Sequence, residues 1–219
     1  MDIQNNLCVP INTLKVAKEI VGGWTVTSKM PTISYSLPAK ECKTGSKLRK
    51  IKDTVCSNCY AMKGNYVQYA KVIEPAMYKR LASISSLDWV NAMVYILKNQ
   101  KSVVNSGVFR WHDSGDIQGL EHLDKIVRIA IATPEIKHWL PTKESNWIQK
   151  YDKPIPKNLV IRLSGTFVDG KEPVSWSHTS TVVSDKDKAT CRAFENDGKC
   201  GDCRQCWDDT VKNVSYFNH

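Results

Sequence analysis

The cysteines are the residues whose spacing points most directly to chemistry, and seven of the eight fall into two groups. The front group consists of Cys42, Cys56 and Cys59. The tail group consists of Cys191, Cys200, Cys203 and Cys206. Pairs of the form C-x2-C recur more often than chance would place them, and grouped thiolates are ligands for iron–sulfur clusters and zinc. We interpret the remaining Cys8 as an ordinary buried thiol.

The tail spacing, C-x2-C-x2-C, is typical of thiolates that wrap around one side of an iron–sulfur cluster, whose fourth ligand comes from elsewhere. Cys191 is the nearest candidate for that ligand. Zinc is the main alternative, because four thiolates also suit a tetrahedral structural site. Three evenly spaced cysteines favour the cluster over zinc, and disulfides are a third alternative.

The front group has three cysteines and no obvious fourth ligand, a set that can hold a cluster with one iron open to a substrate or cofactor. We therefore regard it as the better candidate for a catalytic centre. The alternative is that the two ends of the chain meet in space and that both groups share one cluster. The sequence leaves open whether one cluster or two are present.

Length and composition predict a globular protein. The chain has 219 residues, 42% of them hydrophobic, and no run of roughly 20 apolar residues that could span a bilayer. Its first residues lack a signal-peptide pattern, so we expect a cytoplasmic protein without a membrane partner, whose thiols stay reduced. The net charge is +9, with basic residues crowded between Lys40 and Lys52. This charge indicates either a solvated surface or an anionic partner such as nucleic acid.

Hydrophobic patterns predict strands that alternate with helices. Strands are expected at 32–37, 108–111, 136–140, 159–164 and 181–184, and helices at 10–22, 65–83, 86–99 and around 123–131. Pro75 should kink or split the helix that contains it. The order predicts a parallel sheet with helices outside and with ligands at the carboxyl ends of the strands. We expect an α/β domain over residues 1–184, with a Cys-rich loop at 42–59, and a Cys-rich extension over 185–219 packed on the same domain.

Polar residues follow the predicted strands at the edge where a ligand would sit. Arg110, His112 and Asp116 are the candidate catalytic residues. Arg110 and His112 alternate along one strand and should therefore face the same side. The alternative is that the turn from Asp113 to Asp116 only caps the next helix.

Other polar residues have plainer interpretations. Arg162 lies inside an apolar strand, where an unpaired charge is costly, so it should face a polar pocket or a carboxylate. Lys143 and Glu144 are interpreted as a surface ion pair. Trp207 follows Cys206 directly and should shield the metal site from water.

Several motifs together resemble the bacteriophage family named after gene product 88. They are SYSLPAKECKTGSKL, CSNCYAMKGNY, FRWHDSGDIQ, NLVIRLSG and CGDCRQCW, and they span roughly residues 30–207. The resemblance implies a bacteriophage-encoded protein that acts in the host cytoplasm, and it implies no particular activity.

The chain also resembles, more weakly, the radical S-adenosylmethionine enzymes. The resemblance lies in the three front cysteines, in Tyr60 after the last of them and in a Gly-containing turn after the next strand, although the family spacing is C-x3-C-x2-C. It implies a partial (β/α) barrel, a 4Fe–4S cluster and S-adenosylmethionine as cofactor. It also implies cofactor contacts from Ser114, Gly115, Asp116, Thr142 and Ser164.

Two functions of different classes follow. The leading hypothesis is a 4Fe–4S protein with a fold like that of the radical S-adenosylmethionine enzymes, acting on an unidentified small-molecule or nucleic-acid substrate. The alternative is a nucleic-acid-binding or regulatory protein, stabilised by zinc or an iron–sulfur cluster and without catalysis.

Overall fold

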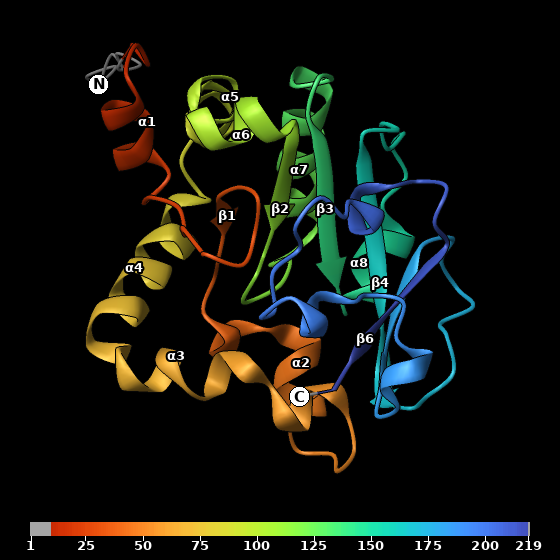
Figure 1. The fold of residues 1–219 in the computed structure, drawn as a ribbon. Helices are drawn as coiled ribbons and strands as arrows, with labels where there is room; N and C mark the ends of the chain where they lie inside the picture. The colour runs from red at the N-terminus through yellow and green to blue at the C-terminus, as the bar shows by residue number, and fades with distance from the viewer. Residues whose placement is uncertain (1–9, 219) are drawn as a thin grey trace.

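Six parallel strands form the sheet that positions the candidate residues (Figure 1). The computed structural model describes residues 10–218, so Cys8 lies outside the described range. The strands are β1 (Ser34–Tyr35), β2 (Val108–Trp111), β3 (Lys137–Thr142), β4 (Leu159–Val168), β5 (Thr179–Val183) and β6 (Asn213–Phe217). Each strand pairs in parallel with the next one along the chain, and β1 and β6 are the two edges of an open sheet.

The predicted α/β fold with a parallel sheet is confirmed. In a doubly wound sheet the strand order reverses at a switch point, whereas here the order simply follows the chain. The last strand, β6, was not predicted and lies inside the expected Cys-rich extension. Only Val214, Tyr216 and Phe217 of this strand are apolar, a signal too short to distinguish from a loop.

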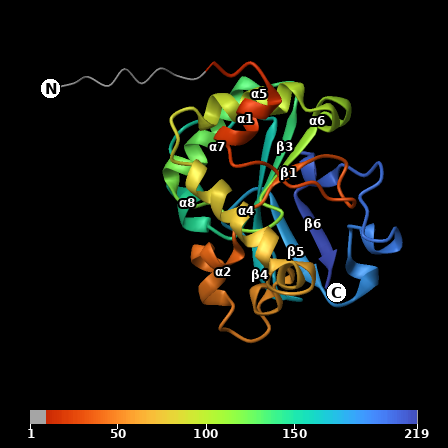
Figure 2. The same cartoon turned by 90° about the vertical axis from the view of Figure 1, so that its left-hand side faces the viewer.

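Helices occupy the connections, and most of them lie on one side of the sheet (Figure 2). They are α1 (Leu14–Ile20), α2 (Lys43–Leu48), α3 (Asn65–Gln68), α4 (Ala70–Ser83), α5 (Trp89–Asn99), α6 (Lys101–Ser106), α7 (Leu120–Ala132) and α8 (Ser145–Lys150). The helix expected over 65–83 is broken at Tyr69 and not at Pro75. Pro75 is exposed, so the carbonyl that loses its amide partner there can face water. None of the helices within residues 10–218 is both long and apolar enough to cross a membrane.

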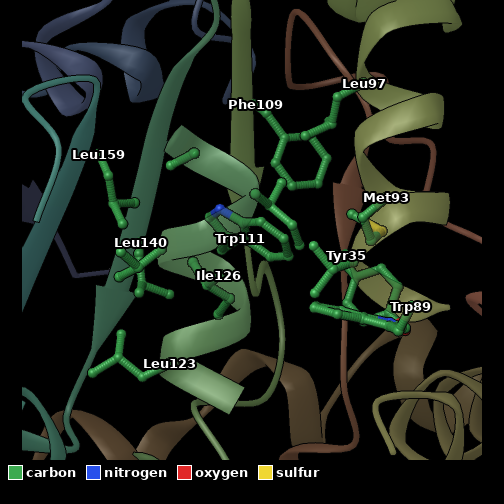
Figure 3. Packing of buried hydrophobic residues seen from close by; sticks show 14 of the residues in the cluster. Tyr35, Trp89, Met93, Leu97, Phe109, Trp111, Leu123, Ile126, Leu140 and Leu159 are labelled. Atoms are coloured by element: carbon green, nitrogen blue, oxygen red, sulfur yellow. The ribbon is translucent and has the colours of Figure 1, made fainter. Parts of the chain in front are cut away.

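The helical side of the sheet carries the larger hydrophobic core (Figure 3). Phe109 and Trp111 of β2 and Leu140 of β3 meet Trp89 of α5 and Leu123 of α7 there. All five side chains are 0% exposed. Burying a large apolar side chain contributes about 1.5–3 kcal/mol, so this core holds the helices against the sheet and orients the strand ends.

The opposite side of the sheet is covered by the C-terminal segment (Figure 2). Trp207 is 2% exposed, packs edge-on against Trp139 with 5.2 Å between ring centroids, and donates a hydrogen bond to the carbonyl of Phe109. Arg162 of β4 is 0% exposed and donates to six backbone carbonyls, five of them between Gln205 and Lys212. Of the two expected surroundings, Arg162 therefore has the polar pocket, which is lined by main-chain oxygens, and not the carboxylate.

Acid should destabilise the fold because His138 is buried in its neutral form. Its Nδ1 accepts a hydrogen bond from Trp111 and its Nε2 lies 2.9 Å from the hydroxyl of Thr133. Burial lowers the pKa of His138 from 6.5 to about 3, so within this pH window the unfolded chain binds a proton that the folded chain does not. Within this window, the free energy of unfolding should therefore fall by about 1.4 kcal/mol for each unit by which the pH is lowered.

Urea unfolding at about pH 7.5 and about pH 5 measures this effect. The variant His138→Gln should show a shallower pH dependence than the wild type. Equal slopes for the two proteins would show that His138 does not carry the effect.

Candidate functional site

The front cysteines lie in the loop that follows β1, at the carboxyl edge of the sheet (Figure 1). Cys42 immediately precedes α2, in a segment where only a loop was expected. Cys56 lies in a 3-10 helix, Val55–Asn58, which begins where Thr54 accepts a hydrogen bond from the amide of Ser57. The amide of Cys59 donates to the carbonyl of Cys56 at 3.3 Å. The C-x2-C pair therefore forms a tight turn that brings its two residues together.

Gly45 is the residue around which two of the thiols gather. A Cβ placed on Gly45 would lie 3.7 Å from the Sγ of Cys42, 3.6 Å from the Sγ of Cys56 and only 3.0 Å from the Cβ of Cys42. A larger residue would thus fill the space that the two sulfur atoms share. Sequence reasoning missed Gly45, although a glycine three positions after a candidate ligand was a usable signal.

Burial disfavours the thiolate forms of Cys42 and Cys56, and neighbouring charges add to this effect or oppose it. Burial raises the pKa of Cys42, and Asp116, Cys59 and Cys56 act in the same direction. Burial also raises the pKa of Cys56, while Lys143 lowers it. The three thiols, Asp116 and Lys143 are therefore close enough to influence one another. A bound metal supplies the positive charge that deprotonates such thiols.

Glu144 ties the cysteine loop to the end of β3. Its carboxylate accepts hydrogen bonds from the amide and the hydroxyl of Thr44, at 2.8 and 2.7 Å, and the side chain is 2% exposed. Lys143 instead donates to the carbonyl of Gly165. The predicted surface ion pair of Lys143 and Glu144 is therefore wrong. The contact joins residues 100 positions apart, so no local pattern could reveal it.

Asp116 links the ends of β2 and β3. Its Oδ1 accepts hydrogen bonds from the amide of Ile117 and the hydroxyl of Thr142, and its Oδ2 accepts one from the amide of Lys143. Burial raises the pKa of Asp116 to about 7, while these three donors act in the opposite direction. Two of the predicted site residues, Asp116 and Thr142, are thus in direct contact, and Asp116 influences Cys42.

The predicted cofactor turn packs against Leu37, two residues after β1. The hydroxyl of Ser114 donates to the carbonyl of Leu37, and the amide of Leu37 donates to the carbonyl of Ser114. Gly115 has φ +81°, and a Cβ there would lie 2.5 Å from the Cβ of Leu37, so only glycine suits this contact. Ser164 lies on β4, where its hydroxyl accepts a hydrogen bond from Ser180.

Arg110 and His112 are not brought together. His112 has φ 51°, which interrupts the strand alternation directly after β2. Its ring lies 5.3 Å from that of His122 on α7, and burial lowers its pKa to about 4. The guanidinium of Arg110 lies over Trp139, 4.5 Å from the ring centroid, on the other side of the sheet. The expectation that both side chains enter one pocket is wrong for this reason.

The tail cysteines gather on the side of the sheet that faces away from the helices. Cys191 and Cys206 pack with Trp139 in the smaller hydrophobic cluster. The amide of Cys203 donates to the carbonyl of Cys200 at 3.0 Å, which repeats the tight turn of the front pair. The front and tail groups therefore gather at different places, one at the edge of the sheet and one on its face, which favours two separate sites over one shared cluster.

The positions of the thiols decide which kind of metal centre they could hold. As they stand, no three His, Cys, Asp or Glu side chains within residues 10–218 are placed to hold a single metal ion. A 4Fe–4S cluster makes a different demand, because its thiolates bind separate irons and lie apart. Two free thiols that flank the buried Gly45, and a third that a tight turn joins to Cys56, fit that donor set.

A family model matches most of this chain. The family is described as Gene product 88, and the match covers residues 11–209. The chain belongs to the Gene product 88 family. The match includes both cysteine groups and the turns after β2 and β3, and it confirms the resemblance to this phage family. No curated protein and no solved structure matches the chain.

Replacing Glu144 by alanine should loosen the front cysteine loop, because Thr44 loses two hydrogen bonds to a buried carboxylate. Hydrogen bonds to charged groups contribute about 1.5–3 kcal/mol each, so we expect the free energy of unfolding to fall by about 2–4 kcal/mol. Urea unfolding measures this loss, and hydrogen–deuterium exchange over residues 42–59 should become faster.

The matched control is Glu74→Ala, which removes an ion pair with Lys40 that is partly exposed to solvent. Such a pair contributes about 0–1 kcal/mol. Losses of equal size in the two variants would contradict the anchoring role of Glu144.

Proposed function

We propose that this protein binds an iron–sulfur cluster at the carboxyl edge of its sheet, with Cys42, Cys56 and Cys59 as ligands. The observation that carries the proposal is the arrangement of these three free thiols: the sulfur atoms of Cys42 and Cys56 flank Gly45, and a tight turn joins Cys59 to Cys56. Thiolates are soft ligands that select iron–sulfur clusters and zinc, and three of them leave one iron of a 4Fe–4S cluster without a protein ligand.

The placement of α2 supports the proposal, because it accounts for the long gap between the first two cysteines. Thirteen residues separate Cys42 from Cys56, and α2 with the turn after it fills this gap. The segment folds back so that both sulfur atoms lie within 3.7 Å of the Cβ position at Gly45. A long spacing in sequence is therefore compatible with a compact set of ligands.

The strand order supports a fold of the radical S-adenosylmethionine type. In that type of enzyme a three-cysteine loop follows the first strand of a partial (β/α) barrel. Here the front loop follows β1, the first strand of an open parallel sheet in chain order. We therefore extend the proposal to S-adenosylmethionine as a cofactor and to an enzyme of this general type.

Individual residues have defined tasks in this proposal. When bound, a cluster of this type supplies one electron to a ligand at its open iron. Glu144 holds the loop of Cys42 through Thr44, and Asp116 holds the main chain of Lys143. Lys143 places a positive charge near Cys56. Among the candidate catalytic residues, Asp116 is the one that lies beside the thiols.

Replacing Cys56 and Cys59 together by serine should remove the cluster. Wild-type protein purified without oxygen should contain iron and acid-labile sulfide, and the double variant should contain about four fewer irons per chain. Adding S-adenosylmethionine to the reduced wild type should change its electron paramagnetic resonance spectrum, because the cofactor would bind the open iron.

Cys8→Ser is the matched control and should keep its full iron content. An unchanged iron content in the double variant, or a wild type that contains only zinc, would refute the front cluster. A spectrum that ignores S-adenosylmethionine would refute the radical-enzyme part and leave cluster binding in place.

Exposed lysines on the front loop favour nucleic-acid binding as a second candidate function. Lys43, Lys47, Lys50 and Lys52 are all exposed, and none of them forms an ion pair with another described residue. A run of unpaired positive charge on one loop attracts phosphate groups.

If this surface binds nucleic acid, Lys47→Gln combined with Lys50→Gln should weaken binding to a fluorescent oligonucleotide. The slope of log affinity against log salt should decrease by about 1–2, because each phosphate contact contributes about 0.7–0.9. Lys15→Gln combined with Lys153→Gln is the control elsewhere on the surface. No binding by the wild type at low salt would rule this candidate out.

A further inference from the structure

The segment that follows the front cysteine loop carries large apolar side chains on its surface. It begins at Tyr60, directly after Cys59, and runs through α3 into α4 (Figure 1). Tyr60 is 57% exposed and Tyr69 is 54% exposed, and the side chain of Val72 is open to solvent as well. Large apolar side chains that gather at one place on a surface are typical of a contact with another molecule.

Five side chains of this segment recur at every third position, and they are Tyr60, Lys63, Tyr66, Tyr69 and Val72. Tight turns connect them, because the amide of Lys63 donates to the carbonyl of Tyr60 and the amide of Tyr66 donates to that of Lys63. The amide of Val72 donates in the same way to the carbonyl of Tyr69. In such turns, side chains three positions apart lie above one another. We call these five residues the tyrosine row.

Tyr66 fixes the position of the first tyrosine of the row. Its ring meets that of Tyr60 edge-on, with 6.0 Å between the ring centroids. Its hydroxyl donates a hydrogen bond to the Oδ2 of Asp113 at 3.4 Å, and Asp113 lies in the turn after β2. A side chain that is held in place before binding loses less freedom when a ligand arrives. Tyr60 therefore presents an exposed ring that is already oriented.

The surroundings of the tyrosine row are strongly basic. Residues 39–79 contain nine Lys and Arg against three Asp and Glu, a net charge of +6 out of the +9 of the whole chain. Lys63 and Lys71 are exposed, and neither forms an ion pair with another residue of the described range 10–218. One of the three carboxylates, that of Glu74, is already paired with Lys40. Positive charge beside the row is therefore available to an anionic ligand.

Exposed aromatic rings beside unpaired lysines fit a single strand of nucleic acid. The bases of a single strand are free to stack on aromatic side chains, while its phosphates contact the basic groups. The bases of a duplex are stacked on one another and present only their edges in the grooves. An apolar protein partner would use the rings of the row but would have no use for its positive charge.

We propose that the tyrosine row binds single-stranded nucleic acid, with Tyr60 and Tyr69 as platforms for stacked bases and with Lys63 and Lys71 as phosphate contacts. The inference rests on the nucleic-acid binding given above as the second candidate function. It adds the kind of nucleic acid and the surface that holds its bases. Because Tyr60 follows Cys59 directly, a bound strand would pass beside the front cysteine loop.

Binding of matched oligonucleotides separates this inference from the candidate function on which it rests. Fluorescence anisotropy is measured at low salt with a labelled thymidine oligomer of about 12 nucleotides, alone and annealed to its complement. The single strand should bind at least about tenfold more tightly than the duplex, because only its bases can stack on the tyrosines. Equal affinities would overturn the inference and leave nucleic-acid binding in place. No binding of either would overturn both.

Replacing Tyr69 tests the stacking contact. Tyr69→Ala should weaken binding of the single strand by about 5–150-fold, which corresponds to about 1–3 kcal/mol for one stacked base. The slope of log affinity against log salt should stay unchanged, because no phosphate contact is lost. Tyr69→Phe keeps the ring and should bind as the wild type does.

Leu87→Ala is the control for the loss of an exposed apolar side chain, because Leu87 lies beyond the other end of α4. It should leave binding unchanged. Equal affinities of Tyr69→Ala and the wild type would overturn the inference and indicate a protein partner for the row.

The lysines of the row have a different signature. Lys63→Gln combined with Lys71→Gln should decrease the salt slope by about 1–2, because each phosphate contact contributes about 0.7–0.9. An unchanged slope would overturn the role of these two lysines as phosphate contacts.

Cross-linking of the wild type tests the same surface without relying on a variant that folds. An oligonucleotide that contains 5-iodouracil is bound and irradiated, so that a base stacked on an aromatic ring becomes joined to it. Mass spectrometry after trypsin digestion should find the nucleotide on the peptides 53–63 and 64–71, which contain Tyr60 and Tyr69. Cross-links confined to other peptides would overturn the proposal.

Discussion

The carboxyl ends of the parallel strands lie at one edge of the sheet, and the arrangement of the front site depends on this constraint. The loop that carries the three front cysteines leaves β1 at this edge, and the turns after β2 and β3 meet it there. Asp116 accepts a hydrogen bond from the amide of Lys143, the first residue after β3, and Glu144 accepts one from the amide of Thr44, close to Cys42. Parallel pairing thus brings residues from three separate parts of the chain to the same thiols.

The two sides of the sheet are covered by different parts of the chain. The helical side holds the large apolar core, which fixes the strand ends in space. The other side would be the interior of a closed barrel, but Trp207 and the tail cysteines occupy it. The front cysteine loop lies instead at the edge of the sheet, where four lysines of the same loop are exposed.

The charges that act on the buried thiols differ between the two cysteine groups. At the front, burial and the carboxylate of Asp116 disfavour thiolates, and Lys143 is a local positive charge. At the tail, burial raises the pKa of Cys206 to about 12, while the charges of Arg110 and Arg162 act in the opposite direction. Carboxylate charge thus acts on Cys42 at the front, whereas guanidinium charge acts on Cys206 at the tail.

Local patterns in the sequence determined a good part of the fold. The run VFRW predicted β2 with its observed bounds, and the spacing of Leu123, Ile126, Val127 and Ala130 predicted α7, because apolar periodicity reflects burial directly. The sequence also determined that the cysteines fall into two groups. These features depend on residues that are close in the sequence, and a sequence pattern contains those residues.

Contacts between distant residues were decided only by the tertiary structure. The positive φ of His112 separates it from Arg110, and the carboxylate of Glu144 turns inward to Thr44. The polar pocket of Arg162 consists of main-chain carbonyls, most of them from the tail. The strand β6 also depends on a distant contact, because its short apolar pattern is completed by pairing with β5 on the other side of the cysteine-rich segment. Each of these contacts depends on which distant segment lies beside the residue in space. The packing of the entire chain decides this.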